Sequence, residues 1–207
     1  MTSSLKDHVQ KLLEEHRGER VFRFKYLGKH YWLKQPEQLK GIWLLLKPYP
    51  KQHFKEECEI LQHLNNIGAP VPKLCGFGDD YLVLEDAGPT LNIWLNDETL
   101  SWAEKSHILH SAIEILINLH QQGIFHGRPA IRDIAWRDGQ ISFMDFESHS
   151  KSHNEHWLIT RDMLAFLDSL CRVKGLDDEK LNELFDYYKS HCPTTYWVDM
   201  LSYVRRF

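Results

Sequence analysis

Apolar and polar residues follow two different periods along the chain, and these periods separate the expected helices from the expected strands. Apolar residues three or four positions apart predict helices over 3–16, 53–67, 101–123, 156–172 and 178–190. Alternating residues predict strands over 20–34, interrupted by a turn at Gly28, and then over 73–78, 81–85 and 141–146. Strands are thus expected mainly in the first 86 residues and helices in the rest, so the expected fold class is α+β.

The strongest helix signal has recognisable ends. Ser101 precedes the apolar pattern and Glu104 follows three residues later, which is the spacing of a capping box. Gly123 comes where the pattern stops, as glycine does at helix ends. In contrast, residues 36–51 combine prolines and lysines with the apolar run IWLLL and follow neither period, so we assign them no element.

Composition is that of an ordinary globular protein. The 207 residues are 43% hydrophobic and 26% charged, enough to bury one large core or two smaller lobes. No apolar run approaches the roughly 20 residues that cross a bilayer, and the opening MTSSLKDHVQ lacks the blocks of a signal peptide. The four cysteines, Cys58, Cys75, Cys171 and Cys192, form no C-x-x-C pair, which favours reduced, mostly buried thiols. We therefore expect a cytoplasmic protein.

Charge is distributed unevenly along the chain. Residues 1–55 hold 12 Lys and Arg against 5 Asp and Glu, while the remainder holds 13 against 24. A basic first quarter suits a polyanionic ligand such as a nucleotide, and an acidic remainder suits divalent cations. Taken alone, the same distribution is equally explained by an uneven solvated surface.

Five short motifs occur in a characteristic order. They are YWLK ending at Lys34, FKEECEILQHLNNIGAPVPKL with Glu57, YLVLEDAG with 85–87, HGRPAIRD with Asp133, and MDFE with Asp145. Taken singly, Lys34 and Glu57 are more typical of solvated surface charges, and Asp133 could merely cap a turn. Their order and spacing together resemble the protein-kinase-like superfamily, and most closely its small prokaryotic members related to lipopolysaccharide-core and Bud32-type kinases.

The resemblance implies a two-lobed kinase-like fold that binds Mg·ATP. Residues 1–207 would form a single kinase-like domain with a leader helix at 1–19. A strand-rich N-lobe would follow at 20–86 and a helical C-lobe at 87–207. The implied activity is ATP-dependent transfer of the γ-phosphoryl group to a hydroxyl.

The resemblance also assigns the nucleotide contacts. Lys34 would touch the α- and β-phosphates of ATP, and Glu57, with Glu56 as the reserve, would hold that lysine in place. Backbone groups from Glu85 to Ala87 would hydrogen-bond adenine. A lysine that is held by a glutamate supplies a point charge at a set position.

Asp133 and Asp145 are the expected Mg²⁺ ligands and, with Arg128, the candidate catalytic residues. Mg²⁺ takes oxygen ligands and bridges phosphates, and carboxylates from a loop and an adjacent strand can supply them. We expect Asp145 to interrupt a buried strand, where a carboxylate is costly unless it is paired or bound to a metal. Glu147 replaces the glycine that usually ends this motif. The resemblance further implies that His126 is structural and that Asp162 braces the loop that begins at His126.

Two departures from the pattern matter. No glycine-rich loop is present, since Gly28 stands alone beside Lys29 and His30. More seriously, Arg128 occupies the position of the aspartate that orients the acceptor hydroxyl.

Three interpretations of Arg128 stay open. In the first, the enzyme still transfers phosphate and Arg128 binds an anionic acceptor or a phosphate oxygen. Asp133 or the substrate then orients the hydroxyl. Alternatively, the chain is an inactive nucleotide-binding pseudokinase that acts through protein partners. In the third, the altered loop supports nucleotidyl transfer.

The partners expected are a nucleotide and an unknown hydroxyl acceptor, either a sugar or lipid-core component or a protein Ser/Thr. The short C-terminal part favours the sugar or lipid-core acceptor. Nucleic acid is not expected, because basic residues are sparse around the aromatic run TYWVDMLSYV, which is more typical of a core. A peripheral membrane contact stays open. His149, His153 and His156 invite a zinc interpretation, but no paired cysteine or H-E-x-x-H motif accompanies them.

Overall fold

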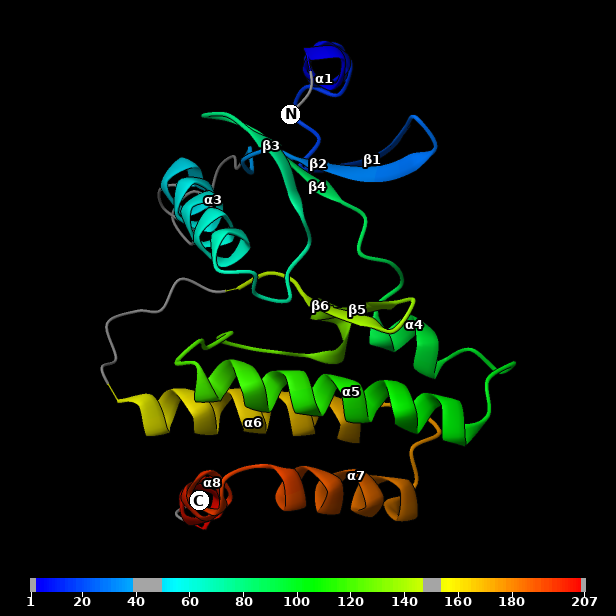
Figure 1. Ribbon diagram of the computed structural model, residues 1–207, viewed down its shortest axis with the longest axis vertical. Coiled ribbons are helices and arrows are strands. Elements are labelled where there is room, and N and C mark those ends of the chain that lie inside the picture. Colours follow the sequence, from blue (N-terminus) through cyan, green and yellow to red (C-terminus); the bar gives the residue numbers. More distant parts are fainter. Residues whose placement is uncertain (1–2, 39–49, 147–153, 206–207) are drawn as a thin grey trace. The chain divides into compact units, whose positions relative to one another are not determined.

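Figure 1 shows the computed structural model of the protein, in which residues 3–38, 50–146 and 154–205 are described. Its contacts divide the chain into two compact units, Met1–Ala87 and Gly88–Phe207. The predictions for most of 36–51, for Glu147 and for the zinc candidates His149 and His153 lie outside the described residues.

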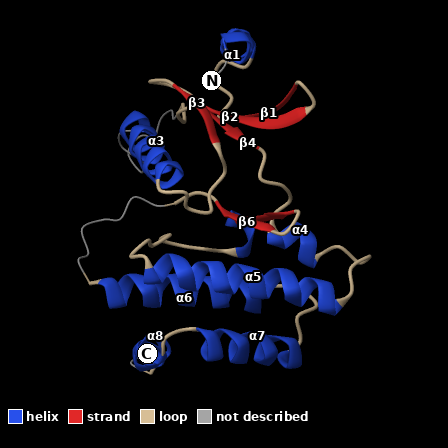
Figure 2. Cartoon of the chain, in the orientation of Figure 1, coloured by secondary structure: helices blue, strands red, loops and turns tan. Residues whose placement is uncertain are grey.

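The first unit contains a four-stranded antiparallel sheet. Its strands are β1 (Val21–Tyr26), β2 (Lys29–Lys34), β3 (Leu74–Phe77) and β4 (Leu82–Glu85), in the order β1-β2-β4-β3 (Figure 2). The predicted turn at Gly28 is confirmed: Leu27 and Gly28 have φ values of 46° and 83°, and a type I′ hairpin turn has positive φ at both central positions. The β2 strand ends at Lys34, as predicted.

Two amphipathic helices bury their apolar faces in this unit. They are α1 (Ser3–Glu15) and α3 (Pro50–Asn66), and both were predicted within a few residues. Leu5 and Val9 of α1 belong to the same core cluster as Leu33 of β2. Leu61 of α3 shares a second cluster with Leu82 of β4. The leader helix is therefore part of the first core.

The second unit is mainly helical. Its elements are α4 (Leu91–Leu95), α5 (Trp102–Gln121), the 3-10 turn η1 (Ile131–Asp133), β5 (Ile134–Arg137), β6 (Gln140–Phe143), α6 (Glu155–Cys171), α7 (Asp178–His191) and α8 (Thr194–Val204). The capping box of Ser101 and Glu104 is present in full, and the chain is α+β as expected. The sequence did not predict α4 or α8, and of the α8 run expected in the core only Met200 is buried. Among the described residues, no helix has both the length and the apolar character needed to span a bilayer.

The expected strand over 141–146 is shorter than predicted. The last pair in the β5–β6 ladder joins Ile134 to Phe143, and Asp145 lies beyond it with an exposed side chain and a φ of 58°. The prediction of a buried Asp145 inside a strand was therefore wrong. An exposed carboxylate stays accessible to solvent, so the desolvation cost expected of a buried acid is avoided.

The cysteines also differ from expectation. All four are free thiols, but Cys58 and Cys192 alone are buried, whereas Cys75 is half-buried and Cys171 is exposed. Burial raises the pKa of the Cys58 thiol, which keeps it protonated and unreactive at neutral pH. The prediction of mostly buried thiols holds for only half of them.

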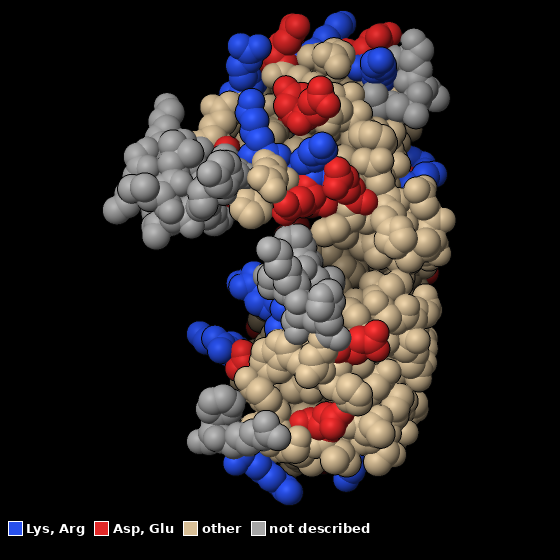
Figure 3. Space-filling model, turned by 90° about the vertical axis from the view of Figure 1, so that its left-hand side faces the viewer, with Lys and Arg blue, Asp and Glu red and all other residues tan. Residues whose placement is uncertain are grey.

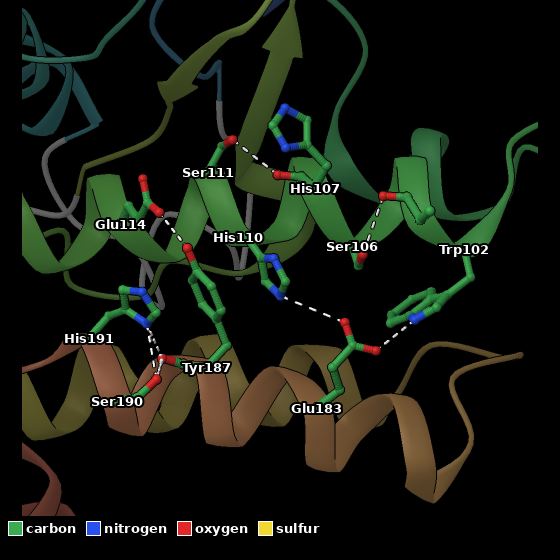
Figure 4. Close-up of polar contacts among 11 residues, drawn as sticks. Trp102, Ser106, His107, His110, Ser111, Glu114, Glu183, Tyr187, Ser190 and His191 are labelled. Atoms are coloured by element: carbon green, nitrogen blue, oxygen red, sulfur yellow. Dashed lines mark hydrogen bonds and ion pairs between the residues drawn. The ribbon is translucent and has the colours of Figure 1, made fainter.

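Polar and aromatic side chains join α5 to α7 (Figure 4). The ring of His110 stacks on Tyr187 with centroids 3.6 Å apart, and Tyr187 donates a hydrogen bond to Glu114 that raises the pKa of the phenol to about 12. Trp102 Nε1 donates to Glu183 at 2.8 Å. These contacts stabilise a helix pair whose facing surfaces are not purely apolar.

This helix pair should weaken in acid. Burial lowers the pKa of His110 in the folded protein. In the unfolded chain this histidine has its ordinary pKa of about 6.5 and is protonated more readily. The contribution of neutral His110 to folding stability is therefore complete above about pH 6.5 and is lost as the pH falls below that value. We expect His110→Phe, which keeps a ring against Tyr187, to flatten the fall in urea midpoint between pH 7.5 and 5.5. His107→Phe, at an exposed position of the same helix, should leave the slope as in the parent, and equal slopes for both variants would contradict the assignment.

Candidate functional site

Helix α6 anchors the loop 126–133 at two points. The Asp162 carboxylate is fully buried and accepts hydrogen bonds from the backbone N–H groups of His126, at 2.7 Å, and Gly127, at 2.9 Å. Further along, the Ile131 N–H donates to Ser169 Oγ at 3.2 Å. The predicted bracing by Asp162 is confirmed, and the loop is held by the helix at its start and near its end.

His126 connects this loop to the segment after β6. Its Nε2 lies 2.7 Å from the Met144 carbonyl oxygen and its Nδ1 lies 3.3 Å from the Arg128 backbone nitrogen. A carbonyl only accepts and a backbone N–H only donates, so Nε2 carries the proton and Nδ1 accepts. The ring is 1% exposed and packs on Phe146 with centroids 4.5 Å apart. These contacts fit the structural role expected for His126.

Asp133 and Asp145 lie within electrostatic reach of one another. The Met144 N–H donates to the Asp133 carbonyl at 2.8 Å, which places the next residue, Asp145, beside the end of the loop. The Asp133 side chain is 13% exposed, and burial, assisted by the charge of Asp145, raises the pKa of its carboxyl, while Arg132 opposes the shift. A cation between the two would relieve both effects.

The residue types suit Mg²⁺. The described residues contain no group of three or more His, Cys, Asp and Glu side chains that could hold a metal ion. Mg²⁺ sites in phosphate-transferring enzymes commonly use one or two carboxylates, with phosphates and water completing the octahedron. Two carboxylate residues therefore fit this ion, and they do not form an all-protein cage for zinc.

The backbone at Asp145 is also unusual. A positive φ is uncommon in residues other than glycine, although aspartate tolerates it better than most. Such positions cluster at functional sites, where the surrounding structure maintains them. Here the buried ring of Phe146 and the Met144 carbonyl bound to His126 hold both neighbours of Asp145. The conformation of Asp145 is thus imposed by its neighbours in the chain.

Arg128 lies on the surface of the same unit. Its side chain is exposed, and it lines a hollow of about 600 Å³ together with Arg132, Arg172 and Lys174. The charge of Arg128 also reaches Asp133, where it favours the ionised carboxylate. The sequence singled out Arg128 but missed Arg172 and Lys174, because nothing in their local pattern indicates a site.

In the first unit, Lys34 and Glu57 form an ion pair. Lys34 Nζ donates to Glu57 Oε1, and the two side chains are 13% and 23% exposed. Glu56, the reserve candidate, instead contacts Gln52 and His53 on its own helix. The pair forms because β2 ends at Lys34 while the second turn of α3 carries Glu57.

A hollow of about 340 Å³ surrounds this ion pair. Its lining comprises Arg20, Lys34, Gln35, Glu37, His53, Phe54 and Glu57. The lysine thus combines partial burial, a fixed partner and open space beside it. This combination separates Lys34 from the exposed lysines of the same sheet, and it is the environment in which a lysine can position a bound anion.

The segment expected to bind adenine is tied to the sheet. The N–H of Glu85 donates to the Lys73 carbonyl at 2.9 Å and the N–H of Asp86 donates to the His30 carbonyl at 3.0 Å. Glu85 also forms an ion pair with Lys29. The adenine hypothesis therefore relies on the Glu85 carbonyl and on the backbone of Ala87, which is half-buried.

The sequence interpretation missed the residue between them. Asp86 is 6% exposed, and its Oδ2 accepts hydrogen bonds from Arg23 Nε at 2.8 Å and Nη2 at 2.6 Å. The signal in the sequence was an acid directly after the apolar strand residues of VLEDAG, because an acid that is buried there needs a partner. Its effect is to fasten the end of β4 to β1.

The structure therefore assembles the candidate residues into two groups. Lys34 and Glu57 meet in the first unit, while Arg128, Asp133 and Asp145 gather around the loop 126–133 in the second.

A similar protein, rather than a family model, shows the family of this chain. No model of a known protein family matches the chain. A protein of Haemophilus influenzae described as uncharacterized is 45% identical over 207 residues, which cover 100% of this chain and 86% of that relative. This chain belongs to the family of that Haemophilus protein. The match spans both compact units, and the description of the relative indicates no activity.

Proposed function

We propose that this protein is an ATP-dependent phosphotransferase with a kinase-like, two-lobed organisation, which transfers the γ-phosphoryl group of Mg·ATP to a hydroxyl. The strand-rich first unit would be the N-lobe and the helical second unit the C-lobe. The acceptor would be a sugar or lipid-core component rather than a protein, because the hollow that Arg128 lines has the volume of a small-molecule site.

One observation carries the proposal. The loop 126–133 is fixed by the buried carboxylate of Asp162 and linked through His126 to the segment 144–146, and this arrangement brings Asp133 and Asp145 together. Preorganised charges of this kind are what phosphoryl transfer requires, because the transition state spreads negative charge over three oxygens. The charge of Asp145 contributes to the raised pKa of the Asp133 carboxyl, and a bound cation would offset this repulsion.

The remaining roles follow from position and charge. Asp133 and Asp145 would hold Mg²⁺, which neutralises phosphate charge when it is bound. Lys34, held by Glu57, would contact the α- and β-phosphates. With an arginine at position 128, proton abstraction by that residue is ruled out, since a guanidinium stays protonated. Orientation of the acceptor hydroxyl would fall to Asp133 or to the substrate, and a loose transition state asks for little proton removal early in the reaction.

Calorimetric titration of ATP, with and without Mg²⁺, tests the nucleotide part of the proposal. We expect binding that strengthens in the presence of Mg²⁺ and that weakens at least about tenfold in Lys34→Met, because a charge-assisted contact to phosphate is lost. The matched control is Lys25→Met, which removes an exposed lysine from the neighbouring strand. Circular dichroism melting should show both variants folded.

Turnover is tested separately, with γ-labelled ATP and a fractionated cell extract. Label that appears in a small-molecule or lipid fraction supports the proposal, whereas label only in protein bands defeats the sugar or lipid-core acceptor. Binding without any transfer would make the protein a pseudokinase. An absence of ATP binding with or without Mg²⁺ would remove the nucleotide from the hypothesis altogether.

A further inference from the structure

The hollow beside Arg128 is strongly basic. Its charged lining residues are Arg128, Arg132, Arg172 and Lys174, with Asp168 as the one acid in the lining, so its formal net charge is +3. In Figure 3, several Lys and Arg side chains (blue) project from the left-hand outline of the second unit. A volume of about 600 Å³ lies within the range of about 300–1,000 Å³ that is usual for small-molecule sites.

The cations come from two separate elements. Arg128 and Arg132 belong to the loop 126–133, whereas Arg172 and Lys174 follow the end of α6. A helix C-terminus attracts one or two cations through its dipole, and this accounts for Arg172 and Lys174 alone. It does not account for two more arginines from a loop some 40 residues earlier in the chain.

The walls of the hollow are held in place. Ser169 on α6 accepts the Ile131 N–H and donates its own hydroxyl to the Phe166 carbonyl at 2.7 Å, which ties the loop to the helix directly beneath the hollow. Asp168 Oδ2 lies 2.9 Å from Arg172 Nη2 at the surface. The backbone that carries the loop arginines is therefore fixed against α6.

We infer that this hollow binds the anionic group, a phosphate or a carboxylate, of a small polyhydroxylated acceptor, and so selects the substrate of the proposed phosphotransferase. The inference rests on the proposed function only in assigning the ligand the role of phosphoryl acceptor. Binding of the anion to the hollow requires no nucleotide. It also assigns a use to an arginine at position 128, where an aspartate would repel such a substrate.

The side chains match this ligand class. Planar guanidinium groups pair with phosphate and carboxylate oxygens through two parallel hydrogen bonds, and lysine adds a point charge. Asn92 of α4 and Asn96, the residue after this helix, line the same hollow, and side-chain amides both donate and accept, as the hydroxyls of a sugar require. A neutral sugar could form hydrogen bonds in the hollow but no ion pair with its cations, so discrimination should depend on the anion.

Three probes that share one sugar ring test the inference: glucose 6-phosphate, glucuronate and glucose. Each is titrated calorimetrically into the parent protein in the presence of saturating Mg·ADP, which blocks the proposed phosphate contacts of the nucleotide. We expect one or both anionic sugars to bind measurably and glucose to bind at least about tenfold more weakly. Preference between the first two identifies the anion as phosphate or carboxylate.

The double variant Arg172→Gln/Lys174→Gln should weaken binding of the anionic sugar by about 10- to 100-fold. Neither residue has a proposed role with the nucleotide, so Mg·ADP affinity should stay within about twofold of the parent. The matched control is Lys189→Gln/Arg205→Gln, which removes two exposed cations from α7 and from the end of α8 and should leave sugar binding unchanged.

Other results would overturn the inference. These are no binding of either anionic sugar to the parent, equal binding of glucose, or equal loss of binding in the control pair. A different result would contradict the proposed function. In that result the parent does not bind Mg·ADP but does bind the anionic sugar, and sugar binding still weakens in the Arg172→Gln/Lys174→Gln variant. In that case the hollow is an anion site of a protein that does not use ATP.

Discussion

Asp162→Ala is expected to lower the free energy of unfolding by about 3–5 kcal/mol, the largest stability effect that we anticipate. The substitution leaves the buried N–H groups of His126 and Gly127 without their acceptor. It also removes the group that faces His120 Nε2 at 3.3 Å. Urea denaturation at neutral pH measures the effect, as a lower midpoint with an unchanged slope.

The same helix supplies the control for this prediction. Asp168→Ala also removes an aspartate from α6, but this side chain is 58% exposed and pairs with Arg172 at the surface. Exposed pairs contribute about 0–1 kcal/mol, so the control should unfold close to the parent. Comparable losses in the two variants would mean that the buried hydrogen bonds to loop 126–133 carry little of the stability of this unit.

Under the proposed function, Asp145→Ala is expected to reduce the rate of phosphoryl transfer by about 100-fold or more. Removal of a metal-binding carboxylate takes away several kcal/mol of charge stabilisation, and each 1.4 kcal/mol is about a factor of ten in rate. Because Asp145 is exposed, the fold should survive its loss. The initial rate with labelled ATP, at several Mg²⁺ concentrations, is the measurement.

The backbone at this position calls for a second variant. Alanine at a φ of 58° costs about 1–2 kcal/mol in the left-handed region, whereas glycine has no such cost. Asp145→Gly should therefore lose the activity while keeping more of the stability than Asp145→Ala. If the glycine variant recovered the activity, the carboxylate would not be a metal ligand and the loss in the alanine variant would reflect the backbone.

Asp138 provides a closely matched control. It is also an exposed aspartate with positive φ, at 51°, in the turn of the same β5–β6 hairpin. Asp138→Gly changes the same chemical group in the same conformation, seven residues away. Full activity in Asp138→Gly together with loss in Asp145→Gly would separate the proposed metal site from general effects on the hairpin.

Much of the local structure could be predicted from the sequence. The turn at Gly28, the capping box of Ser101 and Glu104, and the end of β2 at Lys34 are all present. These features depend on residues that are neighbours in the chain, through backbone conformation, short hydrogen bonds and apolar periodicity. The resemblance to the protein-kinase-like superfamily likewise implied the contacts of Glu57 with Lys34 and of Asp162 with the loop.

Other features were not accessible in this way. The position of Asp145 outside the strand depends on where β5 stops pairing with β6, and the pairing of Asp86 with Arg23 joins residues 63 apart. A local pattern of apolar residues does not report where a ladder ends or which distant charge meets a buried acid.

The sequence by itself determined the class of the fold and most of its elements, and it supplied the candidate residues for the proposed nucleotide and metal sites. The tertiary structure alone decided that Asp145 is exposed, that Asp133 is partly buried beside it, and that Arg172 and Lys174 converge with Arg128 on one hollow. The physical reason is that elements form from neighbouring residues, whereas burial and electrostatic environment arise only when segments far apart in the chain pack together.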